Sequence, residues 1–169
     1  MAFRMHIPRG RKKMIGQLSV HVFNSGEEVP MPSKLIEFFN KQPRLGGLST
    51  ASKDGKPNIA YFLSPHMIDE KTVVMALGNN KTFSNLMENP YAAFMIFEPG
   101  MALSDWKGLR IYLKMKSYQI SGEQLEMMRE RVGQMPGAEP AKMVHAAVTF
   151  EVQEIRPLVD FGQGWSQAI

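Results

Sequence analysis

Apolar residues recur along the chain with two spacings, and each spacing predicts one kind of element. In six segments, apolar and polar residues alternate, or a short apolar run is closed by Gly, Pro or Asn, as in strands with buried faces. The first two of these segments flank Asp54-Gly55, which is a strong signal for a hairpin turn. The predicted strands are residues 48–52, 57–63, 72–77, 92–97, 109–116 and 148–153.

Three other segments repeat apolar residues at intervals of three and four, the spacing of a helix that buries one face. The first begins at Ser33 and the second follows Asn80, and both residues are favourable helix N-caps. Pro90 must end the second helix, because its ring prevents the helix from continuing. The predicted helices cover residues 33–42, 81–89 and 122–136.

The order of these elements predicts a mainly β fold of the α+β class. We interpret residues 68–71 as a turn, which makes the first three strands a consecutive meander. Long crossovers are too few for a parallel sheet. The pattern therefore favours a small antiparallel barrel of six strands with short flanking helices.

The composition indicates one globular domain. The 169 residues are 44% hydrophobic, enough for a sizeable core, and the apolar runs are far shorter than the roughly 20 residues that span a bilayer. There is no cysteine, which excludes disulfides and thiolate metal sites and fits a reducing cytoplasm. We therefore expect a cytoplasmic protein without a membrane partner.

The net charge of +4 comes from the start of the chain. The first thirteen residues hold five basic and no acidic residues, which leaves 15 basic against 16 acidic residues in the remainder. We interpret residues 1–30 as a basic extension outside a core domain at residues 31–169. The extension is an arm that docks on a neighbour, or one that touches RNA or lipid. Because the body is not basic, we expect no nucleic-acid partner.

One short stretch carries candidate chemistry. Residues 72–90 predict a strand, a polar turn and a helix that opens with Lys81 and Thr82. Free backbone N–H groups, the helix dipole, an ammonium and a hydroxyl would suit a phosphate there, although lysines also open helices merely as solvated residues. His66 and His145 show no metal-binding spacing, so no metal site is expected.

The ordered set of motifs resembles a known family over about residues 33–157. The resemblance rests on the stretches LSTASKDGKPNIAYF, GNNKTFSNLMENPYAAFMIF and KMKSYQISGEQLEMMRERV. They are similar to the FMN-binding split-barrel family of pyridoxamine-phosphate-oxidase-like flavoproteins. The resemblance implies a split β-barrel, an FMN cofactor and a homodimer with two cofactor sites at the subunit interface.

The resemblance also implies which residues bind the cofactor. The strand Tyr61-Phe62-Leu63-Ser64 would run along the flavin ring, with its backbone meeting the polar edge. Leu77 and Gly78 would sit beside the ribityl chain. The alternative for the strand is a purely structural one, in which Phe62 is simply a core residue.

Four further positions follow from the resemblance. Lys81 and Thr82 match the family's phosphate-binding pair. Trp106 lies where the family reaches into the partner's flavin site, or it is an interface anchor without cofactor contact. Trp165 would cover a ring face.

The expected function is that of a flavin-dependent oxidoreductase or electron carrier with a small-molecule donor or substrate. The flavin supplies the chemistry, so we name no catalytic residue. The alternatives are a non-catalytic FMN or haem binding protein and a basic-armed nucleic-acid-binding barrel. The tail IRPLVDFGQGWSQAI retains only Arg156, whereas pyridoxamine phosphate oxidases bind the substrate phosphate with an arginine and a histidine there. We therefore expect a relative of that enzyme with another activity.

Overall fold

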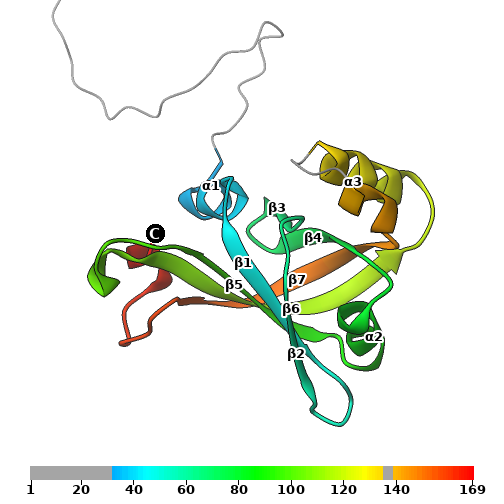
Figure 1. Cartoon of the computed structure of the whole chain (residues 1–169). Coiled ribbons are helices and arrows are strands. Elements are labelled where there is room, and N and C mark those ends of the chain that lie inside the picture. Colours follow the sequence, from blue (N-terminus) through cyan, green and yellow to red (C-terminus); the bar gives the residue numbers. More distant parts are fainter. Residues whose placement is uncertain (1–31, 135–138) are drawn as a thin grey trace, which may run out of the picture. The chain divides into compact units, whose positions relative to one another are not determined.

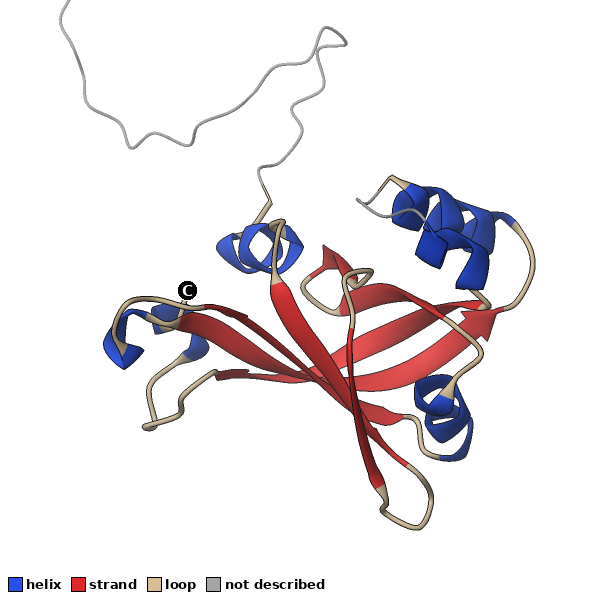
Figure 2. Ribbon diagram, viewed as in Figure 1, coloured by secondary structure: helices blue, strands red, loops and turns tan. Residues whose placement is uncertain are grey.

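The structure is a computed structural model that describes residues 32–134 and 139–169. The predicted basic extension at residues 1–30 lies outside the described residues. The domain that follows is a strongly twisted sheet with helices around its rim (Figures 1 and 2).

One antiparallel sheet of seven strands, in the order β2-β1-β5-β6-β7-β4-β3, forms the centre of the domain. The mainly β, antiparallel fold is therefore confirmed, with one strand more than the six that were predicted. The strands are β1 Leu45–Ala51, β2 Pro57–Tyr61, β3 His66–Asp69, β4 Thr72–Leu77, β5 Tyr91–Glu98, β6 Lys107–Gln119 and β7 Ala146–Pro157.

The predicted meander of three consecutive strands is wrong. β2 pairs with β1, whereas β4 pairs with β3 and β7, so β2 and β4 belong to opposite sides of the sheet. The additional strand β3 has only four residues and follows Pro65, which has no N–H for a ladder. The turn lies at the end of the segment expected, because the Lys71 N–H donates to the Asp69 carboxylate at 2.8 Å.

The hairpin between β1 and β2 turns at Asp54-Gly55, as predicted. Gly55 has a φ of +78°, a conformation that residues with a Cβ rarely adopt. Its N–H donates to the Ser52 carbonyl at 2.9 Å. The turn therefore fixes the register of β1 against β2.

The helices begin where their N-caps predict. The Ser33 hydroxyl accepts from the Ile36 N–H at 3.4 Å, and the Asn80 side-chain carbonyl accepts from the Phe83 N–H at 3.2 Å. The predicted helices are therefore confirmed, although the first and third end a few residues early. The helices are α1 Lys34–Asn40, α2 Lys81–Glu88 and α3 Glu123–Gly133, and the 3₁₀ turns are η1 Leu103–Asp105, η2 Glu139–Met143 and η3 Trp165–Gln167.

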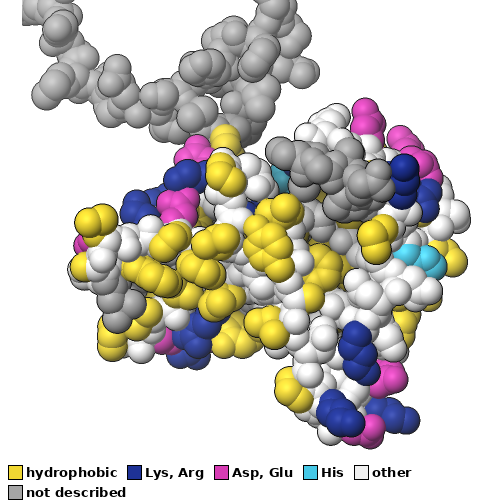
Figure 3. Space-filling view, in the orientation of Figure 1, with side chains coloured by type: hydrophobic (Ala, Val, Ile, Leu, Met, Phe, Trp, Pro, Cys, Tyr) yellow, Lys and Arg dark blue, Asp and Glu magenta, His cyan; other side chains and the backbone are white. Residues whose placement is uncertain are grey.

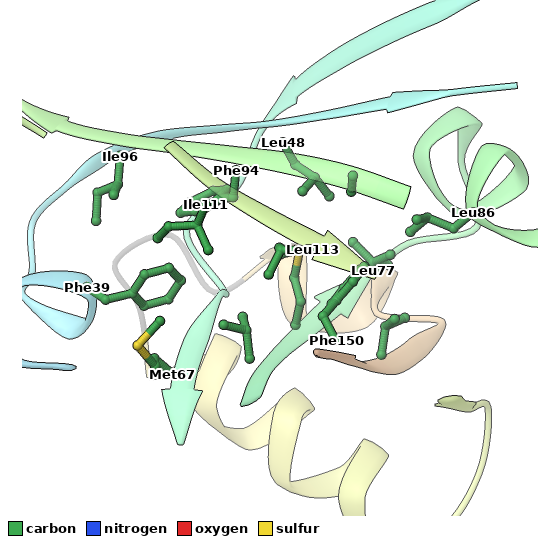
Figure 4. Packing of buried hydrophobic residues seen from close by; sticks show 14 of the residues in the cluster. Phe39, Leu48, Met67, Leu77, Leu86, Phe94, Ile96, Ile111, Leu113 and Phe150 are labelled. Atoms are coloured by element: carbon green, nitrogen blue, oxygen red, sulfur yellow. The ribbon is translucent and has the colours of Figure 1, made fainter. Parts of the chain in front are cut away.

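The main core fills the concave face of the sheet and extends under α1 and α2 (Figure 4). Phe39, Phe94 and Phe150 are fully buried in it, and the rings of Phe39 and Phe94 meet at a centroid distance of 5.6 Å. A second, smaller cluster lies under α3, where Leu125, Met128 and others pack on β4 and β7. Each helix is therefore held to the sheet by its apolar face.

The sheet is not closed into a full barrel. β2 and β3 are its edge strands, and no backbone ladder joins β2 to β4 in the described residues. α2 follows β4 in sequence yet contacts β1 and β2, so this helix spans the open side. The opening between β2 and β4 positions the candidate site.

Candidate functional site

The N-terminus of α2 presents free hydrogen-bond donors. Because Asn80 caps the Phe83 N–H, the first-turn N–H groups of Lys81 and Thr82 have no intrahelical acceptor. The Lys81 side chain is exposed. An ammonium, two N–H groups and the positive end of the helix dipole therefore come together in a way that suits a phosphate.

The turn that leads into α2 is tightly covered. A Cβ on Gly78 would lie 3.2 Å from the Met143 carbonyl oxygen, so a larger residue would push this segment away. The His145 N–H donates to the Leu77 carbonyl at 2.8 Å. The Leu77 side chain is fully buried in the core. At this turn the half-buried Gly78 is therefore open to a ligand, whereas Leu77 is not.

Thr82 points inwards, away from the solvent that Lys81 faces. Its side chain is 2% exposed, and its hydroxyl accepts from the Asn58 amide at 3.1 Å. Asn58 also donates to the Thr50 hydroxyl at 3.4 Å, and Asn85 donates to the same oxygen at 3.2 Å. The Thr82 hydroxyl thus ties α2 to β2, and the Thr82 backbone N–H has no intrahelical acceptor.

β2 offers a free backbone edge to the opening. The Phe62 N–H donates to the Gly46 carbonyl at 3.1 Å, which makes these two residues a hydrogen-bonded pair. Because such pairs alternate along an antiparallel ladder, Ile59 and Tyr61 direct their N–H and C=O groups away from β1. This edge can pair with a ligand that carries donors and acceptors along one rim.

The side chains near this edge are largely engaged by the protein. Tyr61 lies on the outer face, 57% exposed, and its hydroxyl donates to the Arg44 carbonyl at 2.9 Å. Phe62 is half-buried and packs against the main core, which is one of the two roles expected for it. The Leu63 carbonyl accepts from Arg44 at 3.0 Å. The buried Ser64 hydroxyl donates to a backbone carbonyl of β4 at 3.0 Å.

Both tryptophans lie far from α2 in the same chain. α2 leads into the start of β5, whereas Trp106 precedes β6, whose first residue pairs with the end of β5 (Figure 1). Eight residues at roughly 3.3 Å each separate these ends by about 20 Å or more. Trp106 is 39% exposed and stacks on Phe97 at 5.7 Å, and Trp165 packs against the main core. The structure therefore does not bring them to the α2 site of their own chain.

A groove of about 440 Å³ lies between α3 and the strands β3 and β4. At one end the Arg131 guanidinium lies 2.9 Å from His66 Nδ1. Because a guanidinium only donates, Nδ1 is the acceptor and the proton of the neutral ring sits on Nε2. Met127 and Met128 give the groove apolar walls, and Glu130 also lines it.

The surroundings of this groove are positively charged. The buried Arg44 donates to three backbone carbonyls, and no carboxylate among residues 32–134 and 139–169 pairs with Arg44 or Arg131. Burial, and then repulsion from Arg131, lowers the pKa of Arg44 to about 10. Burial, followed by Arg131 and Arg44, lowers the pKa of His66 to about 4. An anionic group would relieve this excess of positive charge.

Sequence reasoning missed three residues of these sites. Asn58 could have been found from the sequence. It lies two and four residues before Ala60 and Phe62, so it is a polar residue on the inward-facing side of β2. Arg131 follows Met127 by four residues, which places both on one stripe of α3. Arg44 had no signal, since the carbonyls that hold it come from remote segments.

The described part of the chain contains no group of three or more His, Asp or Glu side chains that could hold a metal. His145 instead sets its ring edge-on to Phe83 at 5.3 Å. Within the same residues, no helix is both long and apolar enough to cross a membrane.

Comparison with known proteins identifies the family. The model of the pyridoxamine 5'-phosphate oxidase family matches residues 31–158, about three quarters of the chain. The chain belongs to this family. An uncharacterized protein of Methanocaldococcus jannaschii is 34% identical over 82 residues, which are 47% of this chain and 55% of that protein. The chain thus spans only about half the length of this relative.

Solved structures share the fold of this pyridoxamine 5'-phosphate oxidase family member. An FMN-binding protein from Syntrophomonas wolfei superposes with a TM-score of 0.65 at 23% identity, over 75% of this chain and 84% of that one. HutZ, the haem storage protein from Vibrio cholerae, gives a TM-score of 0.54 at 18% identity, over 74% and 94%. At these identities the similarity establishes the split-barrel fold alone.

We predict that His66 titrates with a pKa of about 4, because the buried, cation-flanked site disfavours its charged form. NMR of the ring protons measures this pKa directly. Arg131→Leu removes one of the causes and should raise the pKa of His66 part of the way towards its ordinary value of about 6.5. Arg129→Leu, on the same helix, should leave it unchanged. An ordinary pKa in the wild type would contradict the proposed surroundings.

The same shift predicts how stability depends on pH. The folded state binds the His66 proton more weakly than the unfolded state, so this residue lowers stability as the pH falls from about 6.5 towards 4. His66→Gln should flatten this part of the stability curve. Chemical denaturation at a series of pH values provides the measurement.

Proposed function

We propose that this protein binds FMN and acts as a flavin-dependent oxidoreductase or electron carrier. The observation that carries the proposal is the pairing of two binding features across one opening, the α2 N-terminus and the free edge of β2. FMN has a phosphate at one end and a ring with polar atoms along its rim at the other. Membership of the pyridoxamine 5'-phosphate oxidase family and the similarity to an FMN-binding protein support this assignment.

The residues of the chain would bind and orient this cofactor. Lys81 and the first-turn N–H groups would hold the phosphate, and the backbone of Tyr61 and its neighbours would meet the ring rim. The half-buried Gly78 would lie beside the ribityl chain. The flavin supplies hydride and electron transfer when bound, and no side chain is assigned a catalytic role.

The groove beside α3 suits an anionic electron donor or substrate. It lies along β4 from the α2 turn: Val74 lines the groove and Gly78 follows four residues later, about 13 Å further along the strand. Arg131 and the proton on His66 Nε2 can donate to a carboxylate or phosphate, and the methionines accommodate an apolar body.

We propose that the functional unit is a homodimer with the cofactor sites at its interface. The outer face of β1, β2 and β5 carries exposed apolar side chains, among them Leu45 at 44%, Ile59 at 69% and Tyr61 at 57%. Hydrophobic side chains gather where β1 and β5 run (Figure 3). Such a surface favours a protein partner, and a second copy would bring its Trp106 to the site that this chain's Trp106 cannot reach.

The alternative is a protein of the same fold that holds FMN or haem without turnover, a possibility that the similarity to HutZ favours. The absorption spectrum of the purified protein distinguishes flavin from haem. Steady-state reduction of a bound flavin by NADH or NADPH, coupled to an acceptor, distinguishes an enzyme from a binder.

The Lys81→Ala variant tests the phosphate site. A hydrogen bond to a charged group contributes roughly 1.5–3 kcal/mol, so FMN should bind about ten- to a hundredfold more weakly to the variant. Riboflavin lacks the phosphate, so its affinity should hardly change. Titration of both ligands into the apoproteins measures this. Lys53→Ala removes an exposed charge from the β1–β2 turn and is the matched control. Equal FMN affinity in Lys81→Ala and wild type would exclude this helix terminus as the phosphate site.

The dimer is tested by a charge on the outer face. We expect wild type to sediment as a dimer at micromolar concentration and Ile59→Arg to sediment as a monomer, because burial of an unpaired charge is costly. Met127→Arg, at a similarly exposed apolar residue on α3, should remain a dimer. A wild-type monomer loaded with flavin would refute the proposal.

We further predict that the protein does not oxidise pyridoxamine 5'-phosphate at an ordinary enzymatic rate. Arg156, the one basic residue of the C-terminal segment, already pairs with Asp160 at 2.5 Å and Glu154 at 3.2 Å. The segment therefore brings no free cation to a substrate phosphate. An assay with FMN-loaded protein measures the rate, and efficient turnover would show that the activity is that of the enzyme after which the family is named.

A further inference from the structure

α2 bridges the two sides of the open sheet through polar side chains. Thr82 and Asn85 lie on its inner face, 2% and 0% exposed, and both turn towards the β1–β2 hairpin. Asn58 of β2 stands directly opposite Thr50 of β1 in the ladder and donates to both Thr50 and Thr82. The Asn58–Thr82 hydrogen bond therefore connects the edge strand β2 to the helix that follows β4.

This buried polar cluster has a free-energy cost for folding. The side-chain oxygen Oδ1 of Asn85 is buried without a hydrogen-bond partner in the described structure. An unsatisfied buried acceptor typically costs about 1–3 kcal/mol, and apolar side chains of similar size would avoid that cost. Buried polar groups of this kind are retained in some proteins because they fix one geometry rather than because they stabilise the fold.

The bond joins the two features on which the proposed cofactor site depends. Thr82 is the second residue of α2, next to Lys81 and its phosphate-binding N–H groups. Asn58 precedes Ile59 and Tyr61, whose backbone groups face the opening. In the described residues no backbone hydrogen bond joins β2 to α2 directly. The ladder runs from β2 through β1 to β5, which follows α2 after two residues, so side-chain contacts between α2 and β2 set the remaining fine separation.

We infer that Asn58 is a positioning residue for the cofactor: through Thr82 it sets the distance between the phosphate-binding end of α2 and the ring-binding edge of β2. This inference rests on the proposed FMN site. A ligand that must occupy both ends at once depends on that distance, because misplacing one end sacrifices contacts at the other. A ligand that uses only the ring end does not depend on it.

The experiment compares FMN and riboflavin affinities in apo wild type, Asn58→Leu and Asn58→Ser. Asn58→Leu keeps the approximate volume, and Asn58→Ser is a smaller polar change at this half-buried edge position should the first variant fold poorly. Both should bind FMN about tenfold more weakly, the equivalent of one lost hydrogen bond, while riboflavin affinity stays within about twofold. The preference for FMN over riboflavin should therefore shrink.

Thr50→Val is the matched control. It removes a hydroxyl of the same buried cluster but leaves the Asn58–Thr82 bond in place. Thermal unfolding should show a loss of stability, whereas the ratio of FMN to riboflavin affinity should equal that of wild type. A purely structural role of Asn58 would give this same result for the Asn58 variants.

The outcomes distinguish failure of the positioning role of Asn58 from failure of the proposed FMN phosphate site at α2. If Lys81→Ala lowers FMN affinity but folded Asn58 variants keep the wild-type ratio, the positioning role is wrong and the phosphate site stands. If Lys81→Ala also leaves FMN affinity unchanged, the site itself is wrong and the positioning role falls with it. A reduced ratio in both Asn58 variants, with a wild-type ratio in Thr50→Val, supports the inference.

Discussion

The structure depends on how a sheet with two free edges is closed without a backbone ladder. A full barrel satisfies its edges by pairing the first and last strands, whereas here β2 and β3 stay apart, and α2, which follows β4, packs against β1 and β2. Specific side-chain hydrogen bonds help to hold the two sides together, among them those from Asn58 to Thr82 and from Ser64 to β4. The backbone N–H and C=O groups on the free edge of β2 therefore remain unpaired. They can serve as directional donors and acceptors for a ligand.

Positively charged groups lie at two places around the open sheet. The positive end of α2 lies at one end of it, and the cations Arg44 and Arg131 lie beside β3 and α3 without a carboxylate partner in the described residues. Buried or half-buried cations without a paired carboxylate raise the local potential. The two regions suit a bound anion at one end and an anionic reactant at the other.

The sequence predicted what local patterns determine. Ser33, Asn80 and Asp54-Gly55 act through neighbours within four residues, so the helix starts and the hairpin were predictable. The strand partners were not, because the placement of β2 and β4 on opposite sides depends on contacts across the whole domain. β3 was missed since four residues give too short an alternation to distinguish a strand from a turn.

The same distinction applies to the site. Lys81 was predicted from its helix start and from the resemblance, but nothing local indicated that Thr82 would turn inwards, since that depends on Asn58 twenty-four residues earlier. The pairing of His66 with Arg131 joins residues 65 positions apart and was equally hidden. That these residues contact a ligand stays a prediction. The structure shows which of their atoms the protein already engages in hydrogen bonds.

The location of the two tryptophans has an optical consequence. Trp106 and Trp165 are the only tryptophans of the chain, and Trp106 lies beside the end of β5 that is about 20 Å or more from the end into which α2 leads. Intrinsic emission therefore arises almost entirely from the end of the sheet opposite to the proposed phosphate site. Quenching of tryptophan fluorescence by a bound chromophore would therefore report how close its ring comes to this end of the sheet.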